Sequence, residues 1–138
     1  ETEEQLKYET AVSKAKSHTP AISGVISRAA CNAANELKAA AIVSSTKSGA
    51  TARRISQCRP ECPIVAVTPS EKVAKSLAFC FGVYPVVAED QNSTDAMMAN
   101  ATKIAVENGF ANSGDTVVIA AGLDQVGSTN LLKVSVVE

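Results

Sequence analysis

Four short, uninterrupted apolar runs, separated by segments with helical spacing, constrain the fold of this 138-residue chain more than any other feature. The runs cover residues 40–43, 63–67, 83–87 and 116–121. Continuous rather than alternating hydrophobic residues are typical of strands that are buried on both faces. Strands that alternate with helices form a parallel sheet covered by helices on both sides. The pattern therefore predicts a Rossmann-like α/β domain with three layers, α/β/α.

A fifth apolar segment, residues 131–137, follows the fourth run after about nine loop residues, with no helix between them. A parallel crossover takes a dozen or more residues, so this last strand is predicted to pair antiparallel. We predict a five-stranded, mostly parallel sheet with the strand order 3-2-1-4-5.

Helical spacing is most regular after Thr19 and Pro20, which read as an N-cap followed by proline at the first helical position. The predicted core face of this helix is Ile22, Val25, Ile26, Ala29, Ala30, Ala33, Ala34 and Leu37. Its alanines are small enough to let the helix lie close to the sheet.

Two further helices have clear start and stop signals. One follows the second strand, begins at Thr68-Pro69-Ser70-Glu71 with the spacing of a capping box, and ends near Gly82. The other covers residues 93–108, with Gly109 as its stop. The first is predicted to bury Val73, Ala74, Leu77, Ala78 and Phe81, and the second Met97, Met98, Ala101, Ile104 and Ala105.

Length and composition predict a single domain over residues 1–138, because 46% hydrophobic residues suffice for one core. Residues 1–18 are predicted to form a preceding helix with an apolar face that needs a partner. The net charge of −1 and the absence of a basic stripe exclude a nucleic-acid footprint. No apolar run approaches the roughly 20 residues that cross a bilayer. We expect a soluble, cytoplasmic chain that contacts neither nucleic acid nor membrane.

The sequence offers few side chains that could bind a metal ion or catalyse a reaction. Cys58 and Cys62 are spaced C-x3-C, but the only histidine is His18 and there is no second cysteine pair, so a four-ligand zinc site is not expected. Reduced thiols are expected, with Cys31 and Cys80 on apolar helix faces. His18 lies in a linker between two helices and is the one histidine from which a Ser-His or Cys-His pair could draw its base, so we predict a binding domain with no catalytic residues.

Two loops should lie at the carboxyl edge of the sheet, where Rossmann-like domains bind ligands. The loop at 45–51 offers four hydroxyls, an ammonium group on Lys47, and Gly49, with the next helix starting near Ser48 or Gly49. An anion would be well solvated by free N–H groups there. The same pattern also fits a capped turn in which Ser48 satisfies the amides of the helix. The polar loop at 122–129 fits a ligand-closing loop, and equally a surface connection between two strands.

Several ordered motifs resemble the C-terminal domain of pyruvate kinase, from Thr19 onward through nearly the whole chain. They are residues 48–53 (SGATAR), 59–68 (RPECPIVAVT), 82–86 (GVYPV), 113–119 (SGDTVVI) and 127–133 (GSTNLLK). The segment before Thr19 is similar to the helix that joins the barrel of that enzyme to its C-terminal domain.

The resemblance implies a regulatory, homotetramer-forming module of a glycolytic enzyme that transfers a phosphoryl group from phosphoenolpyruvate to ADP. Catalysis, together with magnesium and potassium, would belong to a barrel of about 250 residues, so the isolated domain is expected to lack cofactors and kinase activity. The phosphate cradle carried over by motif position consists of Thr46, Lys47, Ser48, Gly49, Ala50 and Thr51. The closing loop, residues 122–129, contributes Gly122, Gly127, Ser128 and Thr129.

Two features depart from family members that bind a sugar bisphosphate. The chain has no tryptophan, and it offers Glu89 and Asp90 after the third strand. AMP or a sugar monophosphate therefore becomes competitive with a sugar bisphosphate as the effector, although Lys47 leaves a bisphosphate possible. The alternative is a purely structural module, in which the cradle is a capped turn and the last strand and outer helices form tetramer contacts.

Overall fold

Residues 22–91, 93–121 and 131–138 are described by a computed structural model, in which helices and strands alternate as the sequence predicts. The elements are α2 (Ile22–Leu37), β1 (Ala41–Ser45), α3 (Ala50–Gln57), β2 (Ile64–Thr68), α4 (Glu71–Leu77), β3 (Val83–Val87), α5 (Thr94–Glu107), β4 (Thr116–Ala121) and β5 (Leu131–Val136). The predicted helix at 1–18 and the Thr19-Pro20 cap lie outside the described residues.

The five strands form one sheet in the order β3-β2-β1-β4-β5, which confirms the predicted order. β1 pairs parallel with β2 and with β4, and β2 pairs parallel with β3. β5 pairs antiparallel with β4, with Thr116 opposite Val136 and Ala121 opposite Leu131, as the short connection predicted. β1, β2 and β4 are buried on both faces, whereas β3 and β5, at the two edges, are partly exposed.

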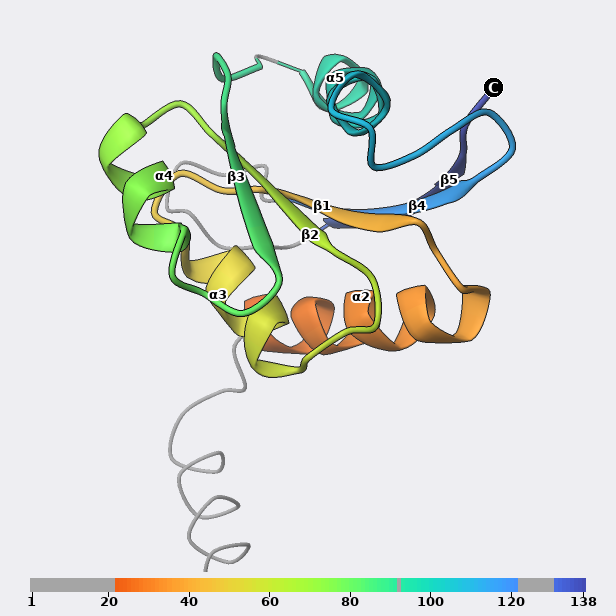
Figure 1. Ribbon diagram of the computed structural model, residues 1–138, viewed down its shortest axis with the longest axis horizontal. Coiled ribbons are helices and arrows are strands. Elements are labelled where there is room, and N and C mark those ends of the chain that lie inside the picture. The colour runs from red at the N-terminus through yellow and green to blue at the C-terminus, as the bar shows by residue number, and fades with distance from the viewer. Residues whose placement is uncertain (1–21, 92, 122–130) are drawn as a thin grey trace, which may run out of the picture.

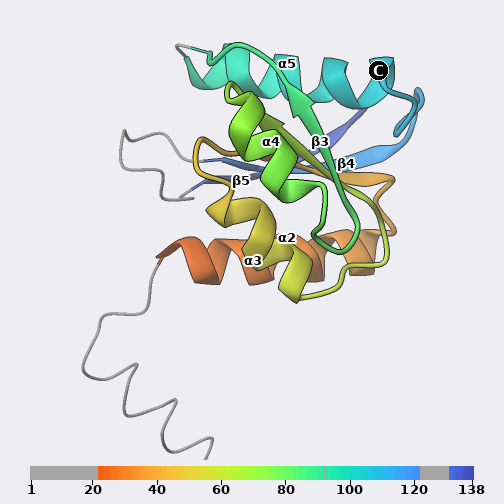
Figure 2. The same ribbon diagram turned by 60° about the vertical axis from the view of Figure 1, so that its left-hand side comes forward.

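Helices cover both faces of the sheet, so the predicted α/β/α layering is confirmed. α5 lies alone on one face, and α2 and α3 lie on the other (Figures 1 and 2). Leu77 of α4 belongs to the same buried cluster as Ile55 of α3, which assigns α4 to the face of α2 and α3. None of the helices in the described part of the chain is long and apolar enough to cross a membrane.

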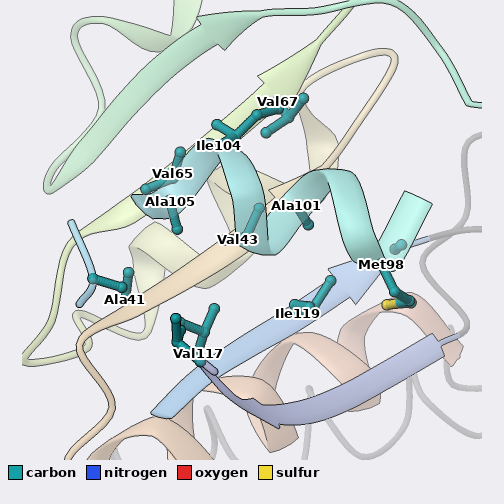
Figure 3. Close-up of a cluster of buried hydrophobic side chains, with 13 residues drawn as sticks. Ala41, Val43, Val65, Val67, Met98, Ala101, Ile104, Ala105, Val117 and Ile119 are labelled. Carbon is teal, nitrogen blue, oxygen red and sulfur yellow. The ribbon is translucent and has the colours of Figure 1, made fainter. Parts of the chain in front are cut away.

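Two hydrophobic cores fill the space between the sheet and its helices. Beneath α5, Met98, Ala101, Ile104 and Ala105 pack against valines and isoleucines of β1, β2 and β4 (Figure 3). This is the predicted core face of α5. The helix is capped by Ser93, whose Oγ accepts a hydrogen bond from Ala96 N–H, and it ends before Gly109, which has a φ of 80°.

The buried face of α2 differs from the prediction. Ile22, Val25 and Leu37 are 64%, 48% and 51% exposed, while Ser23 and Ser27 are buried. Ser27 Oγ donates a hydrogen bond of 2.7 Å to the backbone oxygen of Ser23, one turn earlier in the same helix, so this buried hydroxyl has a partner. Ala30 and Ala34 of the predicted face are buried, which confirms that part of the prediction, and Cys31 is buried with them.

The boundaries of α4 also correct the prediction. Its N-cap is Ser70, whose Oγ accepts from Val73 N–H, and Thr68 instead ends β2 and accepts from Ser70 N–H. The helix stops at Leu77 rather than near Gly82. Ala78 and Phe81 were predicted to face the core, but they lie beyond the helix and are exposed. Cys80 also lies in this turn and not on a helix face.

Candidate functional site

The carboxyl ends of β1 and β4 meet at one edge of the sheet. Ser45, the last residue of β1, pairs with Ala121, the last residue of β4. The loop after β1 therefore starts beside the end of β4, as the predicted strand order requires. Gly122, Gly127, Ser128 and Thr129, the predicted members of the closing loop, lie outside the described residues.

The loop after β1 turns sharply into α3 through Thr46 and Gly49. Thr46 N–H donates to Val67 O at 2.9 Å, which ties the loop to the end of β2. Thr46 Oγ1 accepts from Gly49 N–H at 2.8 Å. Gly49 has a φ of 89°, is the N-cap of α3, and provides no side-chain cap hydrogen bond. The predicted helix start is confirmed, and it differs from the serine-capped starts of α4 and α5.

The other predicted cradle residues differ in exposure. Lys47 and Ser48 are exposed, and Ala50 is partly buried. Ser48 Oγ accepts from Ala50 N–H at 3.3 Å, a long bond that is itself exposed. Thr51 is only 2% exposed, so its side chain lies inside the fold, in the first turn of α3. The solvent-facing polar groups of the loop are therefore those of Lys47 and Ser48.

Arg53 is a site residue that sequence reasoning missed. Its Nη1 donates to Ser48 O at 3.2 Å, and its Nη2 donates to Ser76 Oγ of α4 at 2.8 Å. Ser76 Oγ in turn donates to Val73 O. The guanidinium thus fastens the loop to α4 and brings a positive charge to its base. Helical spacing could have found it, because Arg53 lies one turn after Gly49 on the same helix.

An ion pair links this loop to the segment after β3. Lys47 Nζ lies 3.1 Å from Asp90 Oδ2, and both side chains are about half exposed. Beneath the pair is a cavity of about 50 Å³, with Val67, Met97 and Ala101 among its lining residues. The sequence placed Glu89 and Asp90 in a loop near the site, but the contact with Lys47 depends on the tertiary structure.

Residues 24–135 match the family described as pyruvate kinase, alpha/beta domain. The chain belongs to this family. A pyruvate kinase of Clostridium acetobutylicum is 43% identical over 141 residues, which cover the whole of this chain and 30% of that protein. Pyruvate kinases of Staphylococcus epidermidis and Staphylococcus aureus are 48% and 46% identical over 103 residues, which cover 73% of this chain and 18% of theirs. This pyruvate kinase domain therefore spans less than a third of the relatives it matches.

Cysteines gather on the other side of this pyruvate kinase domain, where α2 meets the end of α3. Cys31 Sγ lies 3.7 Å from Cys58 O. Burial raises the pKa of the Cys31 thiol, and the neighbouring Cys58 and Cys62 raise it further. Burial also raises the pKa of Cys62. Across the described ranges, no group of three or more His, Cys, Asp or Glu side chains could hold a metal ion.

Proposed function

We propose that this chain is the effector-binding domain of a pyruvate kinase, and that the loop at 46–51 holds the phosphate of the effector. The observation that carries the proposal is the start of α3. There the N-cap is Gly49, which has no side chain to cap the helix, and the side chain of Lys47, with its ammonium group, is exposed in the same loop. A helix N-terminus presents backbone N–H groups and a partial positive charge, which favour an anion.

The loop can supply a phosphate with several donors. The Ser48 hydroxyl faces solvent, and the hydrogen bond that it accepts from Ala50 N–H is long enough to be replaced by one to a phosphate oxygen. Lys47 adds a full charge, since charge-assisted hydrogen bonds are stronger than neutral ones. Thr46 and Arg53 act indirectly, because their hydrogen bonds hold Gly49 and Ser48 in place.

The rest of the proposal concerns the parent protein. We infer that the residues outside this chain carry phosphoryl transfer from phosphoenolpyruvate to ADP, with the magnesium and potassium ions that the reaction needs. This domain would then bias the enzyme between quaternary states, because an effector that binds one state more tightly shifts the population toward it. Closure of the loop at 122–129 over the effector belongs to the same proposal.

A titration of the 138-residue chain tests the cradle directly. AMP, glucose 6-phosphate and fructose 1,6-bisphosphate are added to labelled protein, and affinities are measured by NMR and calorimetry. We expect the double variant Lys47→Gln, Ser48→Ala to lose about tenfold or more in affinity, since two charge-assisted contacts are removed. Lys103→Gln, the matched control, removes one exposed lysine from α5 and should bind as the parent does. Equal binding by the double variant and the parent would exclude the cradle.

A specific observation also favours the structural alternative. α2 exposes Ile22, Val25 and Leu37, and β5 exposes Val134 and Val136 at an edge of the sheet. Exposed apolar side chains and an unpaired strand edge are features of protein contact surfaces. If this surface assembles subunits, sedimentation should show self-association that Val25→Asp and Val134→Asp abolish. Self-association without any phosphate ligand would support a structural module.

A further inference from the structure

The Lys47–Asp90 ion pair joins the proposed phosphate loop to the segment after β3, and both of its residues line the adjacent cavity. Lys47 follows β1 and Asp90 follows β3, so the pair bridges two segments at the carboxyl edge of the sheet. Both side chains are about half exposed, and ion pairs of this kind are weak and screened by salt. An incoming phosphate dianion can therefore compete with Asp90 for the ammonium group.

The cavity under the pair is too small for a ligand while the pair is closed. Its volume of about 50 Å³ holds a few water molecules at most, because one water needs about 10–15 Å³. Its lining is suited to a polar organic group once it opens. Val67, Met97 and Ala101 contribute apolar surface, while Asn100, Glu89 and Asp90 contribute an amide and two carboxylates.

We propose that Asp90 sets the ligand class of this site, an inference that rests on the proposed function. The phosphate of the ligand replaces Asp90 as the ion-pair partner of Lys47. The carboxylates of Asp90 and Glu89 then accept hydrogen bonds from the rest of the ligand. Hydroxyl or amine groups satisfy these acceptors. A second phosphate there would meet the carboxylates of Glu89 and Asp90, while Lys47, the ion-pair partner of Asp90, is engaged by the first phosphate. The site therefore takes a phosphate monoester with an uncharged, hydroxyl-rich body and disfavours a bisphosphate.

A matched ligand pair tests this assignment on the 138-residue chain. Glucose 6-phosphate and glucose 1,6-bisphosphate differ by one phosphate, and their affinities are measured by calorimetry. We expect Asp90→Asn to bind the monophosphate about two- to fivefold more tightly, since an exposed ion pair no longer holds Lys47. The bisphosphate should gain more, about tenfold, because a like charge is also removed. Glu107→Gln, which removes one exposed carboxylate at the far end of α5, should leave the ratio of the two affinities unchanged.

A double-variant cycle separates the two roles of Asp90. When Lys47→Gln is already present, Asp90→Asn should no longer improve monophosphate binding, but it should still improve bisphosphate binding. If the parent binds these phosphates and Asp90→Asn leaves their ratio as in Glu107→Gln, the role of Asp90 is overturned and the proposed function stands. If the parent chain binds no phosphate ester at all, both proposals fail together.

Discussion

Thr46 Oγ1 accepts a hydrogen bond of 2.8 Å from the backbone N–H of Gly49, within a loop where Thr46 itself is only 7% exposed. This contact fixes the direction in which the chain enters α3. It is made inside the protein, where water does not compete for the two groups. The shape of the candidate cradle is therefore set by a residue whose hydroxyl is buried.

Replacement of that hydroxyl should lower stability. Thr46→Ala leaves the N–H of Gly49 without its acceptor, and we expect a loss of about 1–2 kcal/mol in the free energy of unfolding. Thr46→Ser keeps the oxygen and should recover most of the loss. Ser48→Ala removes only a long, exposed bond and should cost less than about 0.5 kcal/mol. Urea denaturation measures all three, and equal losses for Thr46→Ala and Ser48→Ala would contradict the assignment.

Replacing Gly49 and Gly24 by alanine should change the free energy of unfolding in opposite directions. At Gly49 the φ of 89° is strained for alanine, and an added Cβ would lie 2.9 Å from Arg53 Nη1 and 3.2 Å from Leu77 Cδ2. Gly49→Ala should cost about 1–2 kcal/mol. At Gly24, inside α2, an added Cβ meets only Arg28 at 3.6 Å, so Gly24→Ala should stabilise by about 0.5–1 kcal/mol. Thermal unfolding compares them, and a shift of the same sign in both would disprove the prediction.

The guanidinium of Arg53 should be needed for the order of the loop. Arg53→Ala removes the hydrogen bonds to Ser48 O and Ser76 Oγ, and we expect a loss of about 0.5–1.5 kcal/mol. Arg53→Lys cannot bridge both partners and should recover little. Arg54→Ala, on the same helix, is the control. NMR shifts of the Ser48 and Ala50 amides should move in the Arg53 variants and stay in place in Arg54→Ala.

The rate of thiol alkylation should differ between exposed and buried cysteines. Cys58 is exposed, whereas Cys31 is 4% exposed and its pKa is raised, first by burial. At pH 7.5 iodoacetamide should therefore modify Cys58 well before Cys31, because the thiolate is the reactive form. Mass spectrometry of digests gives the order. Modification of Cys31 at the rate of Cys58 would mean that α2 opens readily.

The same pKa shifts predict how stability depends on pH. A thiol whose pKa is raised in the folded protein keeps its proton there after the unfolded chain has begun to lose its own. The unfolded state then binds fewer protons, so the free energy of unfolding falls as pH rises above about 8.5, and no effect is expected below it. Cys31→Ala should flatten this slope in urea titrations between neutral and alkaline pH, and an unchanged slope would contradict the prediction.

The sheet was predictable because its signals are local and repeated. Buried parallel strands need continuous apolar runs, and the runs at 63–67 and 116–121, where the structure has β2 and β4, could be read without any knowledge of their neighbours. The short connection before β5 excluded a parallel crossover, which settled its antiparallel pairing. The start of α3 was predicted near Ser48 or Gly49, and Gly49 is its N-cap.

The buried faces and the N-caps of the helices were harder to predict, because they depend on contacts between distant residues. Helical spacing predicted that Ile22 and Val25 face the core, but the structure exposes them and buries the smaller Ser23 and Ser27. A capping box at Thr68 was plausible on spacing, and the extension of β2 to Thr68 moved the cap to Ser70. For both the buried face of α2 and the N-cap of α4, the tertiary structure differs from what the local sequence pattern predicted.

The sequence by itself determined the family and the hydroxyl-rich loop, because contiguous residues carry both. It also determined the strand order, because strands that alternate with helices and a short last connection predict that topology. Only the tertiary structure decided which side chains act together. It paired Lys47 with Asp90 and Arg53 with Ser76, and it buried Thr51 while leaving Ser48 exposed. Such contacts join residues that the chain keeps far apart, because the carboxyl ends of parallel strands converge only when the sheet forms.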